Sequence, residues 1–335
     1  MNFVKSAFIL ASSFVLCSGT MLVASSSQPW GYSESDYGIK VDEIRFDDCL
    51  YSIYRCNGEL TASFDKVGRA ENESASRFTC RSCPSDDSRP WEILQIQNFI
   101  NYEGNVVPVV EIGAAAFVEA NSKFKLVHIP ANIEVITPTA FYLAPVQHVI
   151  FSEDSKLKHI CDHAFFHSSL ECIAIPRSVI SIGDEAFSAE YFYEVVFEEG
   201  SLLEEIGYSA FSETSLESIT IPPKVRTIPV GCFSECDELR RVTILPDSEL
   251  TEFGHGAFFK CTKLLTIDNL EKVTKLGDRC FLDCNKFNPV CSEEWQPEIE
   301  EFTFRWCAFG ERFRDRIDQL TAARLARSNP DSTRP

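Results

Sequence analysis

Three histidines in the segment HICDHAFFH have a spacing that can bind a metal ion. His159, His163 and His167 are four residues apart, so a continuous helix would place all three imidazoles on one face, where they could ligate zinc. The chain repeats itself through this region, and the corresponding positions in other copies hold variable residues such as Ser181 and Glu185. A long helix is not expected in a repeat that also contains a strand and a turn. We therefore expect no metal ion here.

Cys161 and a neighbouring histidine have the residue types of a nucleophilic pair. No third group that would orient the histidine can be identified, and Cys161 occupies the position that Gly183, Gly207 and Gly277 hold in other copies, which indicates a structural role. The chain also lacks a Walker-type loop, a G-x-S-x-G elbow and a dinucleotide-binding fingerprint. We expect no catalytic residues, no cofactor and no enzymatic activity.

Four further cysteines lie nearer the amino terminus, at Cys49, Cys56, Cys80 and Cys83. Together they could hold zinc through four thiolates, although the spacing of the first two is looser than zinc sites prefer. In a secreted chain, disulfides are the more common use of such residues. The sequence therefore favours a disulfide-bonded segment over a zinc site, with free thiols as a further alternative.

The elements that would position these side chains follow from an internal repeat. An Ala-Phe or Cys-Phe pair recurs at intervals of 22–25 residues, and most pairs are followed by a segment of the form L-x-x-I-x-I-P. In LECIAIP this segment alternates with a period of two, so Ile173 and Ile175 are expected to point inward and Ala174 outward, as in a short strand. The phenylalanines of the pairs are Phe117, Phe141, Phe165, Phe187, Phe211, Phe233, Phe258 and Phe281.

One such unit cannot bury its own apolar face. A strand, a turn and a compact half-helical piece become stable when copies stack and share a continuous core. Pro130, Pro176 and Pro222 are expected to end their strands, because proline cannot continue a backbone ladder. The phenylalanines would form a column along the stack, each contributing about 1.5–3 kcal/mol on burial.

The cysteines of the repeats are expected to belong to this core. Cys232 and Cys280 replace the alanine of the Ala-Phe pair, whereas Cys236, Cys261 and Cys284 each follow their phenylalanine by three positions. Free cysteine packs as a small hydrophobic residue. Removal of a leader before residue 28 would leave 13 of the 14 cysteines, so at least one thiol would be unpaired.

The Ala-Phe pairs, the Ile-Pro strand ends and the cysteines three positions after phenylalanine resemble the BspA-like leucine-rich repeats of bacterial and protist surface proteins. The resemblance covers roughly residues 106–290. It implies a leucine-rich-repeat solenoid, β-rich with short helical turns, containing about eight repeats of 22–25 residues. It also implies surface display, adhesion and host contact, and it supplies no catalytic residues.

The flanks lie outside this resemblance. Residues 1–27 combine Lys5 with an apolar run and small residues, as in a signal peptide, with an uncleaved anchor as the alternative. Residues 28–105 are expected to form a cysteine-containing amino-terminal cap. Residues 291–335 are expected to form a carboxy-terminal cap, in which Phe313, Ile317 and Leu320 lie at helical spacing, followed by a disordered tail. The alternative role of this helix is an oligomer contact. No transmembrane span is expected after the signal.

The charge of the chain limits its partners. The formal net charge of −19 opposes binding to a phosphate backbone or to an anionic membrane, because both depend on lysine and arginine. Nucleic acid is therefore excluded as a partner. The charge agrees with a soluble protein that avoids non-specific contacts. The signal-like segment and the family resemblance, not the charge, indicate a secreted or surface location.

The expected binding surface is the outward face of the strand column. Its first half is unusually apolar, and an exposed apolar patch with a polar rim is typical of an interaction site, unless another part of the chain covers it. We expect a non-enzymatic protein-binding module that contacts a host cell-surface or extracellular-matrix protein. The alternative is a surface protein that self-assembles. The expected contact residues are Leu126, His128, His148, Ile150, Ala174, Glu194, Val196, Thr220, Arg241 and Thr243.

Overall fold

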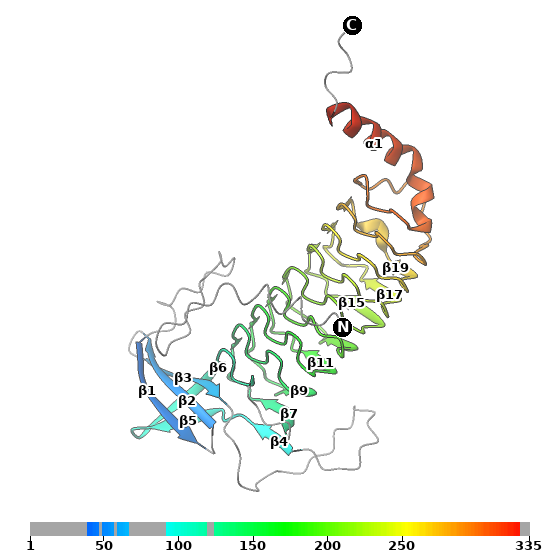
Figure 1. Ribbon diagram of the computed structural model, residues 1–335. Coiled ribbons are helices and arrows are strands. Elements are labelled where there is room, and N and C mark those ends of the chain that lie inside the picture. Colours follow the sequence, from blue (N-terminus) through cyan, green and yellow to red (C-terminus); the bar gives the residue numbers. More distant parts are fainter. Residues whose placement is uncertain (1–38, 47–48, 57–58, 67–91, 119–123, 329–335) are drawn as a thin grey trace.

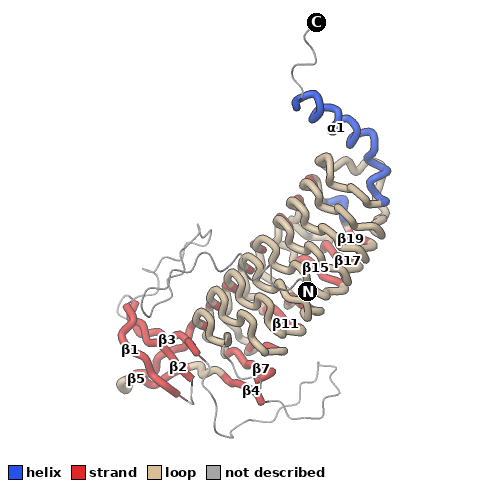
Figure 2. The backbone as a smooth tube through the Cα atoms, in the orientation of Figure 1, coloured by secondary structure: helices blue, strands red, loops and turns tan. Residues whose placement is uncertain are grey.

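The computed structural model describes residues 39–46, 49–56, 59–66, 92–118 and 124–328. Its short turns of chain stack into an elongated solenoid, with strands β1 to β3 at one end and helix α1 at the other (Figure 1). Figure 2 shows that loops and turns connect the short strands and that helix is concentrated at the carboxy-terminal end. This is the repeat architecture that the sequence predicts.

The first sheet contains the strands that the L-x-x-I-x-I segments predict. In β11, Ile173 and Ile175 are buried and Ala174 is exposed, as expected for a strand with one face on the core. The predicted prolines follow the last residues of β7, β11 and β15. Neighbouring strands of the repeats pair in parallel: β7 (Phe124–Ile129), β9 (His148–Phe151), β11 (Cys172–Ile175) and β13 (Glu194–Phe197), then β15 (Ser218–Ile221), β17 (Arg241–Ile244) and β19 (Thr266–Asp268).

Each turn also contains a second strand that the sequence analysis did not predict. These strands are two residues long, too short for a period of two to be recognised. Their second residue is buried, so they line the opposite side of the core. They are β8 (Val135–Ile136), β10 (His159–Ile160), β12 (Ser181–Ile182), β14 (Glu205–Ile206), β16 (Thr227–Ile228), β18 (Glu252–Phe253) and β20 (Lys275–Leu276).

The Ala-Phe segment forms a third backbone ladder in place of a helix. Around Phe165, the amides of His163, Phe165 and His167 donate to carbonyl oxygens of the next turn at 2.8, 2.8 and 2.9 Å. The residue two positions before each phenylalanine has a left-handed backbone. Two of these eight positions are glycine, and the other six hold larger residues whose strain the stacking must offset. They are Ala115, Thr139, His163, Glu185, Ser209, Gly231, Gly256 and Arg279.

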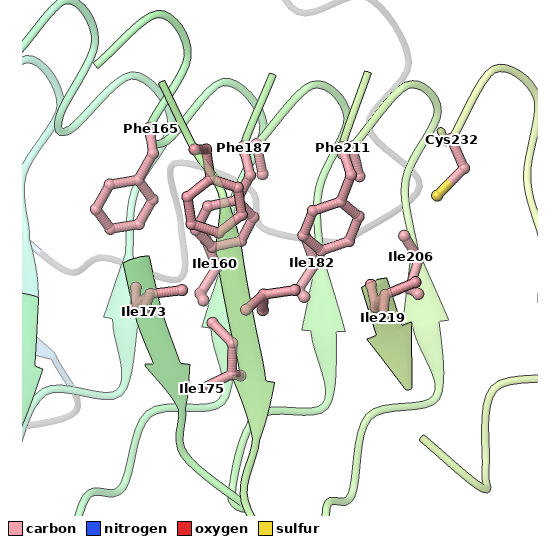
Figure 3. Close-up of a cluster of buried hydrophobic side chains, with 14 of the residues drawn as sticks. Ile160, Phe165, Ile173, Ile175, Ile182, Phe187, Ile206, Phe211, Ile219 and Cys232 are labelled. Atoms are coloured by element: carbon pink, nitrogen blue, oxygen red, sulfur yellow. The ribbon is translucent and has the colours of Figure 1, made fainter. Parts of the chain in front are cut away.

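The predicted phenylalanine column runs through the core (Figure 3). Its rings stack with centroid separations of 4.1–5.6 Å from Phe117 to Phe281. Isoleucines of the two sheets, such as Ile173 and Ile160, lie beneath it. The preceding alanine or cysteine is fully buried between stacked turns, so only a small side chain fits there.

The column extends beyond the repeats recognised in the sequence. Phe64 in β3 (Glu59–Lys66) stacks on Phe117 at 5.5 Å, and Phe304 stacks on Phe281 at 5.5 Å. The sequence does indicate a further repeat at Phe304. This residue follows Phe281 by 23 residues, and Cys307 stands three positions after it, as in other repeats. Thr303 replaces the alanine, which concealed a further copy in the predicted carboxy-terminal cap.

Both ends of the solenoid carry additional elements. At the amino-terminal end, β1 (Ile39–Phe46) pairs antiparallel with β2 (Cys49–Cys56), and β2 pairs with β3. Strand β3 then pairs with β6 (Asn105–Ile112), which joins these strands to the second sheet, the one formed by the two-residue strands from β8 onward. Strand β5 (Phe99–Tyr102) pairs with β6, and β4 (Glu92–Gln95) pairs with β7 in the first sheet. At the other end, the 3-10 helix η4 (Ala308–Phe313) leads into α1 (Arg314–Ser328), and a shorter one, η3 (Leu270–Lys272), follows β19.

Both sheets are interrupted at one level of the stack, between β13 and β15 and between β14 and β16. In neighbouring turns the residue after the two-residue strand donates its amide to the previous turn, as Gly207 does to Ile182 at 2.8 Å and Gly254 does to Ile228 at 2.7 Å. Pro229 stands at this place and has no N–H to donate. Pro222 likewise removes a donor after β15.

Candidate functional site

The strand register places the predicted contact residues in two rows on the outer face of the first sheet. One row pairs Leu126 with His148 and Cys172 with Glu194; the other pairs His128 with Ile150 and Ala174 with Val196. After the interruption, the rows continue as Arg241 beside Ser218 and Thr243 beside Thr220. The alignment read from the repeats is therefore correct.

The apolar part of this face lies on β9, β11 and β13. Ile150 is 39% exposed and Val196 is 50% exposed, with the exposed methyl group of Ala174 on the strand between them. Glu194 is exposed beside Val196, and Thr220 is exposed beyond the interruption. We call the group formed by Ile150, Ala174 and Val196 the apolar strand patch.

Two predicted contact residues do not belong to the surface. Leu126 and His148 are each only 4% exposed, so the expectation that they lie on the open face is wrong. His148 lies between Leu126 and Cys172, with its Nδ1 3.6 Å from the sulfur of Cys172. Burial lowers the pKa of His148, which keeps its imidazole neutral inside the fold.

His128 is an intermediate case. Its side chain is half-buried, and Nδ1 has no hydrogen-bond partner among the described residues. Burial lowers the pKa of His128 as well. This side chain therefore presents a neutral ring at the edge of the apolar strand patch, beside Ile150.

The carboxy-terminal part of the same face is polar. Arg241 Nε donates to Asp268 Oδ2 at 2.7 Å, and Thr243 Oγ1 donates to the same oxygen at 3.3 Å. Asp268 raises the pKa of the already basic Arg241 further. Because these groups satisfy one another, this end forms a polar border to the apolar strand patch.

The three histidines of HICDHAFFH do not share a helical face. His159 is in β10, whereas His163 and His167 are in the following turn with left-handed backbones. His159 Nδ1 lies 2.7 Å from Ser181 Oγ, and His163 Nε2 lies 3.6 Å from a carboxylate oxygen of Glu185. The imidazoles of His159 and His163 thus face the next turn of the solenoid, whereas the ring of His167 lies against that of Phe166, with 4.1 Å between the centroids.

The repeat cysteines behave as core residues, and Cys161 is partly buried beside them. Burial raises the pKa of Cys161 to about 12, with Asp162 and Glu111 adding to the effect, so the thiol stays protonated. Burial also raises the pKa of Cys236 to about 11. The sulfur atoms of Cys236, Cys261 and Cys284 each donate to a phenylalanine carbonyl of the preceding turn at 2.9–3.0 Å. A protonated, hydrogen-bonded thiol is a poor nucleophile.

We predict that the five buried repeat thiols resist alkylation in the folded protein. Cys232, Cys236, Cys261, Cys280 and Cys284 are fully buried and form no disulfides. Treatment with iodoacetamide at neutral pH, followed by peptide mass spectrometry, should label them only after denaturation. Half-exposed Cys291 is the internal control and should react in the native state. Labelling of the five at the rate of Cys291 would contradict this assignment.

The side chains of Cys56, Cys80 and Cys83 lie outside the described residues, as does the expected signal peptide at 1–27. The expected disulfide-bonded or zinc-binding segment therefore stays a prediction. Within the part of the chain that the structure describes, no three or more His, Cys, Asp or Glu side chains gather as a metal site. No helix among these residues is long and apolar enough to cross a membrane.

A hollow of about 810 Å³ opens where the second sheet is interrupted, a feature that sequence reasoning missed. Its walls include Tyr208, Lys224 and Arg226. The two cations pair with Glu204 at 3.4 Å and with Glu249 at 2.8 Å. These pairs neutralise the two cations, and Asp184 and Glu205 add two further carboxyl groups to the walls. The sequence signal for this hollow is Pro229, which occupies the glycine position of other repeats.

The comparison with known families agrees with this architecture. The model for the BspA type leucine rich repeat region matches residues 110–240 and 204–312, well over half of the chain. The chain belongs to the BspA-type leucine-rich-repeat family. The match continues past residue 290, in agreement with the additional copy around Phe304.

Several solved structures are similar to this chain, and PcpA is similar at the level of the fold. The pneumococcal vaccine antigen PcpA is 22% identical, with a TM-score of 0.56 over 77% of this chain and 72% of its own. The leucine-rich-repeat protein TpLRR of T. pallidum is 25% identical, with a TM-score of 0.41 over 51% of this chain and 77% of its own. A leucine-rich cell surface protein of Faecalibacterium prausnitzii is 16% identical, with a TM-score of 0.34 over 81% of this chain and 88% of its own. A search of curated proteins finds no match.

Proposed function

We propose that this BspA-type repeat protein is a non-enzymatic, secreted or surface-displayed module that binds another protein through the apolar strand patch. The observation that carries the proposal is the alignment of Ile150, Ala174 and Val196 as solvent-facing apolar residues on three successive strands. Contact with a partner would remove this apolar area from water, which is favourable by about 25 cal/mol per Å². Such a patch with a polar border is typical of interaction surfaces.

The border supports a specific contact. Glu194, Thr220 and Arg241 are exposed around the apolar strand patch. Charged groups at the rim of an interface steer a partner and fix its orientation more than they add affinity. The partner surface would therefore offer an apolar centre with complementary charges at its edge.

Location outside the cell is part of the proposal. A signal peptide at 1–27 would direct the chain to secretion. Among its structural neighbours, PcpA is a vaccine antigen and the F. prausnitzii protein is a cell surface protein. A host cell-surface or extracellular-matrix protein is the proposed partner, which makes adhesion the biological role.

Binding of the purified protein to host cells and to immobilised matrix proteins tests this function. The double variant Ile150→Glu/Val196→Glu places two charges in the apolar strand patch, so saturable binding should fall by at least about tenfold, which corresponds to 1.4 kcal/mol. Both side chains point to solvent, so circular dichroism should show an unchanged fold. A Glu153→Gln variant, on the exposed loop after β9, is the control and should bind normally.

Two results would contradict the proposal. Full binding by the folded double variant would place the contact on another surface. Oligomers that depend on protein concentration, and that the same double variant abolishes, would indicate that the patch pairs copies of this chain, as in a self-assembling surface protein.

A further inference from the structure

The interruption of the second sheet leaves backbone carbonyl groups without donors. In an intact turn, the carbonyl oxygen of Ile160 accepts from the amide of Gly183 at 2.7 Å. Ile206 is the equivalent residue at the interruption, and Pro229 of the next turn has no N–H to donate to it. The carbonyl oxygen of Glu204 likewise accepts no backbone hydrogen bond from the described residues.

These two residues belong to the walls of the hollow of about 810 Å³ described above. A volume of this order is in the range of small-molecule sites, about 300–1,000 Å³. A backbone carbonyl group away from bulk water requires a hydrogen-bond donor, from water or from a ligand. A ligand that fills the hollow must therefore bring donors of its own.

The walls also contain donors that the protein does not use. Arg226 donates through Nε to Glu249, and its two terminal nitrogen atoms donate to no other described residue. The hydroxyl group of Thr227, an exposed residue of the same wall, forms no hydrogen bond within the described part of the chain. A fitting ligand must accept hydrogen bonds as well as donate them.

Tyr208 adds a flat apolar surface to this polar hollow. The residue is 60% exposed, and its ring stacks on no other aromatic side chain of the described residues. Its backbone is fixed, because its amide donates to Asp184 Oδ1 at 2.7 Å. The electron-rich face of an aromatic ring attracts the weakly positive C–H groups of a sugar ring.

The charges of the walls select among ligands. Lys224 and Arg226 are paired with carboxylates, so an anionic ligand would find no unpaired cation in the walls and would face Asp184 and Glu205. A simple cation would meet these carboxyl groups but could not accept from Arg226 or Thr227. An apolar ligand would leave all these polar groups without partners. A neutral molecule with many hydroxyl groups satisfies both kinds of group.

We propose that the hollow binds a neutral oligosaccharide, with one sugar ring stacked on Tyr208. Hydroxyl groups of the sugar donate to the Ile206 carbonyl group and accept from Arg226 and Thr227. An open hollow covers only part of such a ligand, so the dissociation constant should be on the order of 10⁻⁴–10⁻³ M. This site lies on the second sheet and is independent of the apolar strand patch.

Saturation-transfer difference NMR of the purified protein tests the site with lactose, maltotriose, mannotriose and chitotriose. This panel presents galactose, glucose, mannose and N-acetylglucosamine rings, which differ in the orientation and substitution of their hydroxyl groups. We expect saturation transfer to at least one of them at about 5 mM, strongest at the C–H protons that lie on the tyrosine ring. Absence of transfer to all four sugars would overturn the proposal.

Variants locate the bound sugar. Tyr208→Ala should weaken binding by at least about tenfold, whereas Tyr208→Phe keeps the aromatic face and should bind within about twofold of the natural protein. Arg226→Met keeps much of the side-chain length without its N–H donors and should lose affinity severalfold. The control is Tyr191→Ala, at a tyrosine that is 66% exposed outside the hollow, and it should bind normally. Equal binding by Tyr208→Ala and Tyr191→Ala would overturn the proposal.

Two further comparisons fix the ligand class and the independence of the site. Trigalacturonate, an anionic sugar, should bind at least about fivefold more weakly than the preferred neutral sugar, because it faces Asp184 and Glu205. Binding of spermidine that displaces the sugar and exceeds its affinity would mean that the hollow is a cation site, and the proposal would fail. The variant Ile150→Glu/Val196→Glu should bind the sugar normally, so loss of protein binding and loss of sugar binding are separate results.

Discussion

Replacing Gly207 with valine is expected to prevent normal folding of the solenoid. A Cβ atom at this position would lie 2.3 Å from the carbonyl carbon of Gly183 and 2.4 Å from the amide nitrogen of Asp184. Both are backbone atoms of the preceding turn and cannot move aside as a flexible side chain would. Since overpacking alone costs about 1–3 kcal/mol in cores that can adjust, we expect a loss of more than about 3 kcal/mol here.

Urea denaturation followed by far-ultraviolet circular dichroism measures this loss. Gly200→Ala is the matched control, because a Cβ there meets no atom within 4 Å. Gly200 has a φ of 75°, so alanine should still cost about 1–2 kcal/mol through backbone strain. A Gly207→Val protein as stable as the control would show that adjacent turns can separate without penalty.

Replacing Phe211 with alanine is expected to cost about 3–5 kcal/mol of unfolding free energy. Its ring is fully buried and stacks on Phe187 at 5.4 Å and on Phe233 at 5.6 Å. Alanine would leave a cavity in the middle of the column, bounded by rings that stay in place because their own backbone ladders hold them.

The comparison with Phe259→Ala isolates the effect of the column. Phe259 is half-buried and lies outside the stack of rings. The ammonium nitrogen of Lys260 is 5.0 Å from the centroid of its ring. Its replacement should cost no more than about 1.5 kcal/mol. Similar losses for the two variants in chemical denaturation would contradict a central role for the phenylalanine column.

The repeat architecture could be predicted because one physical constraint acts again at every turn. Eight Ala-Phe or Cys-Phe pairs reveal the column, since alanine or cysteine must fit between stacked turns and phenylalanine must fill the centre. The same periodicity gave the correct inward and outward residues of β11. The copy around Phe304 was missed because the search pattern allowed only alanine or cysteine before phenylalanine. Threonine, as at Thr303, is also small enough to fit between stacked turns.

Burial on the outer face was harder to predict than its register. Leu126 and Ile150 stand in equivalent rows, yet Leu126 is buried, since exposure depends on what packs beside the first strands and not on the period of two. The second strands were also missed, because two residues carry no period.

The missing donors at Pro222 and Pro229 give the molecule a mechanical weak point. At that level neither sheet is continuous, and most of the backbone hydrogen bonds that cross lie beside the phenylalanine column, such as Ser209 N–H to Val230 O and Phe211 N–H to Cys232 O, both 3.0 Å. Ser215 N–H to Phe192 O at 2.9 Å and the Lys224–Glu204 ion pair at 3.4 Å are further links. The solenoid should therefore bend most easily at this level, by opening on the side where the sheets are interrupted. Under force, the turns should separate at this level first. When a bound partner pulls on the protein, the solenoid should therefore bend or separate between β13 and β15, and the turns on either side should stay intact. Unfolding from the ends should come later.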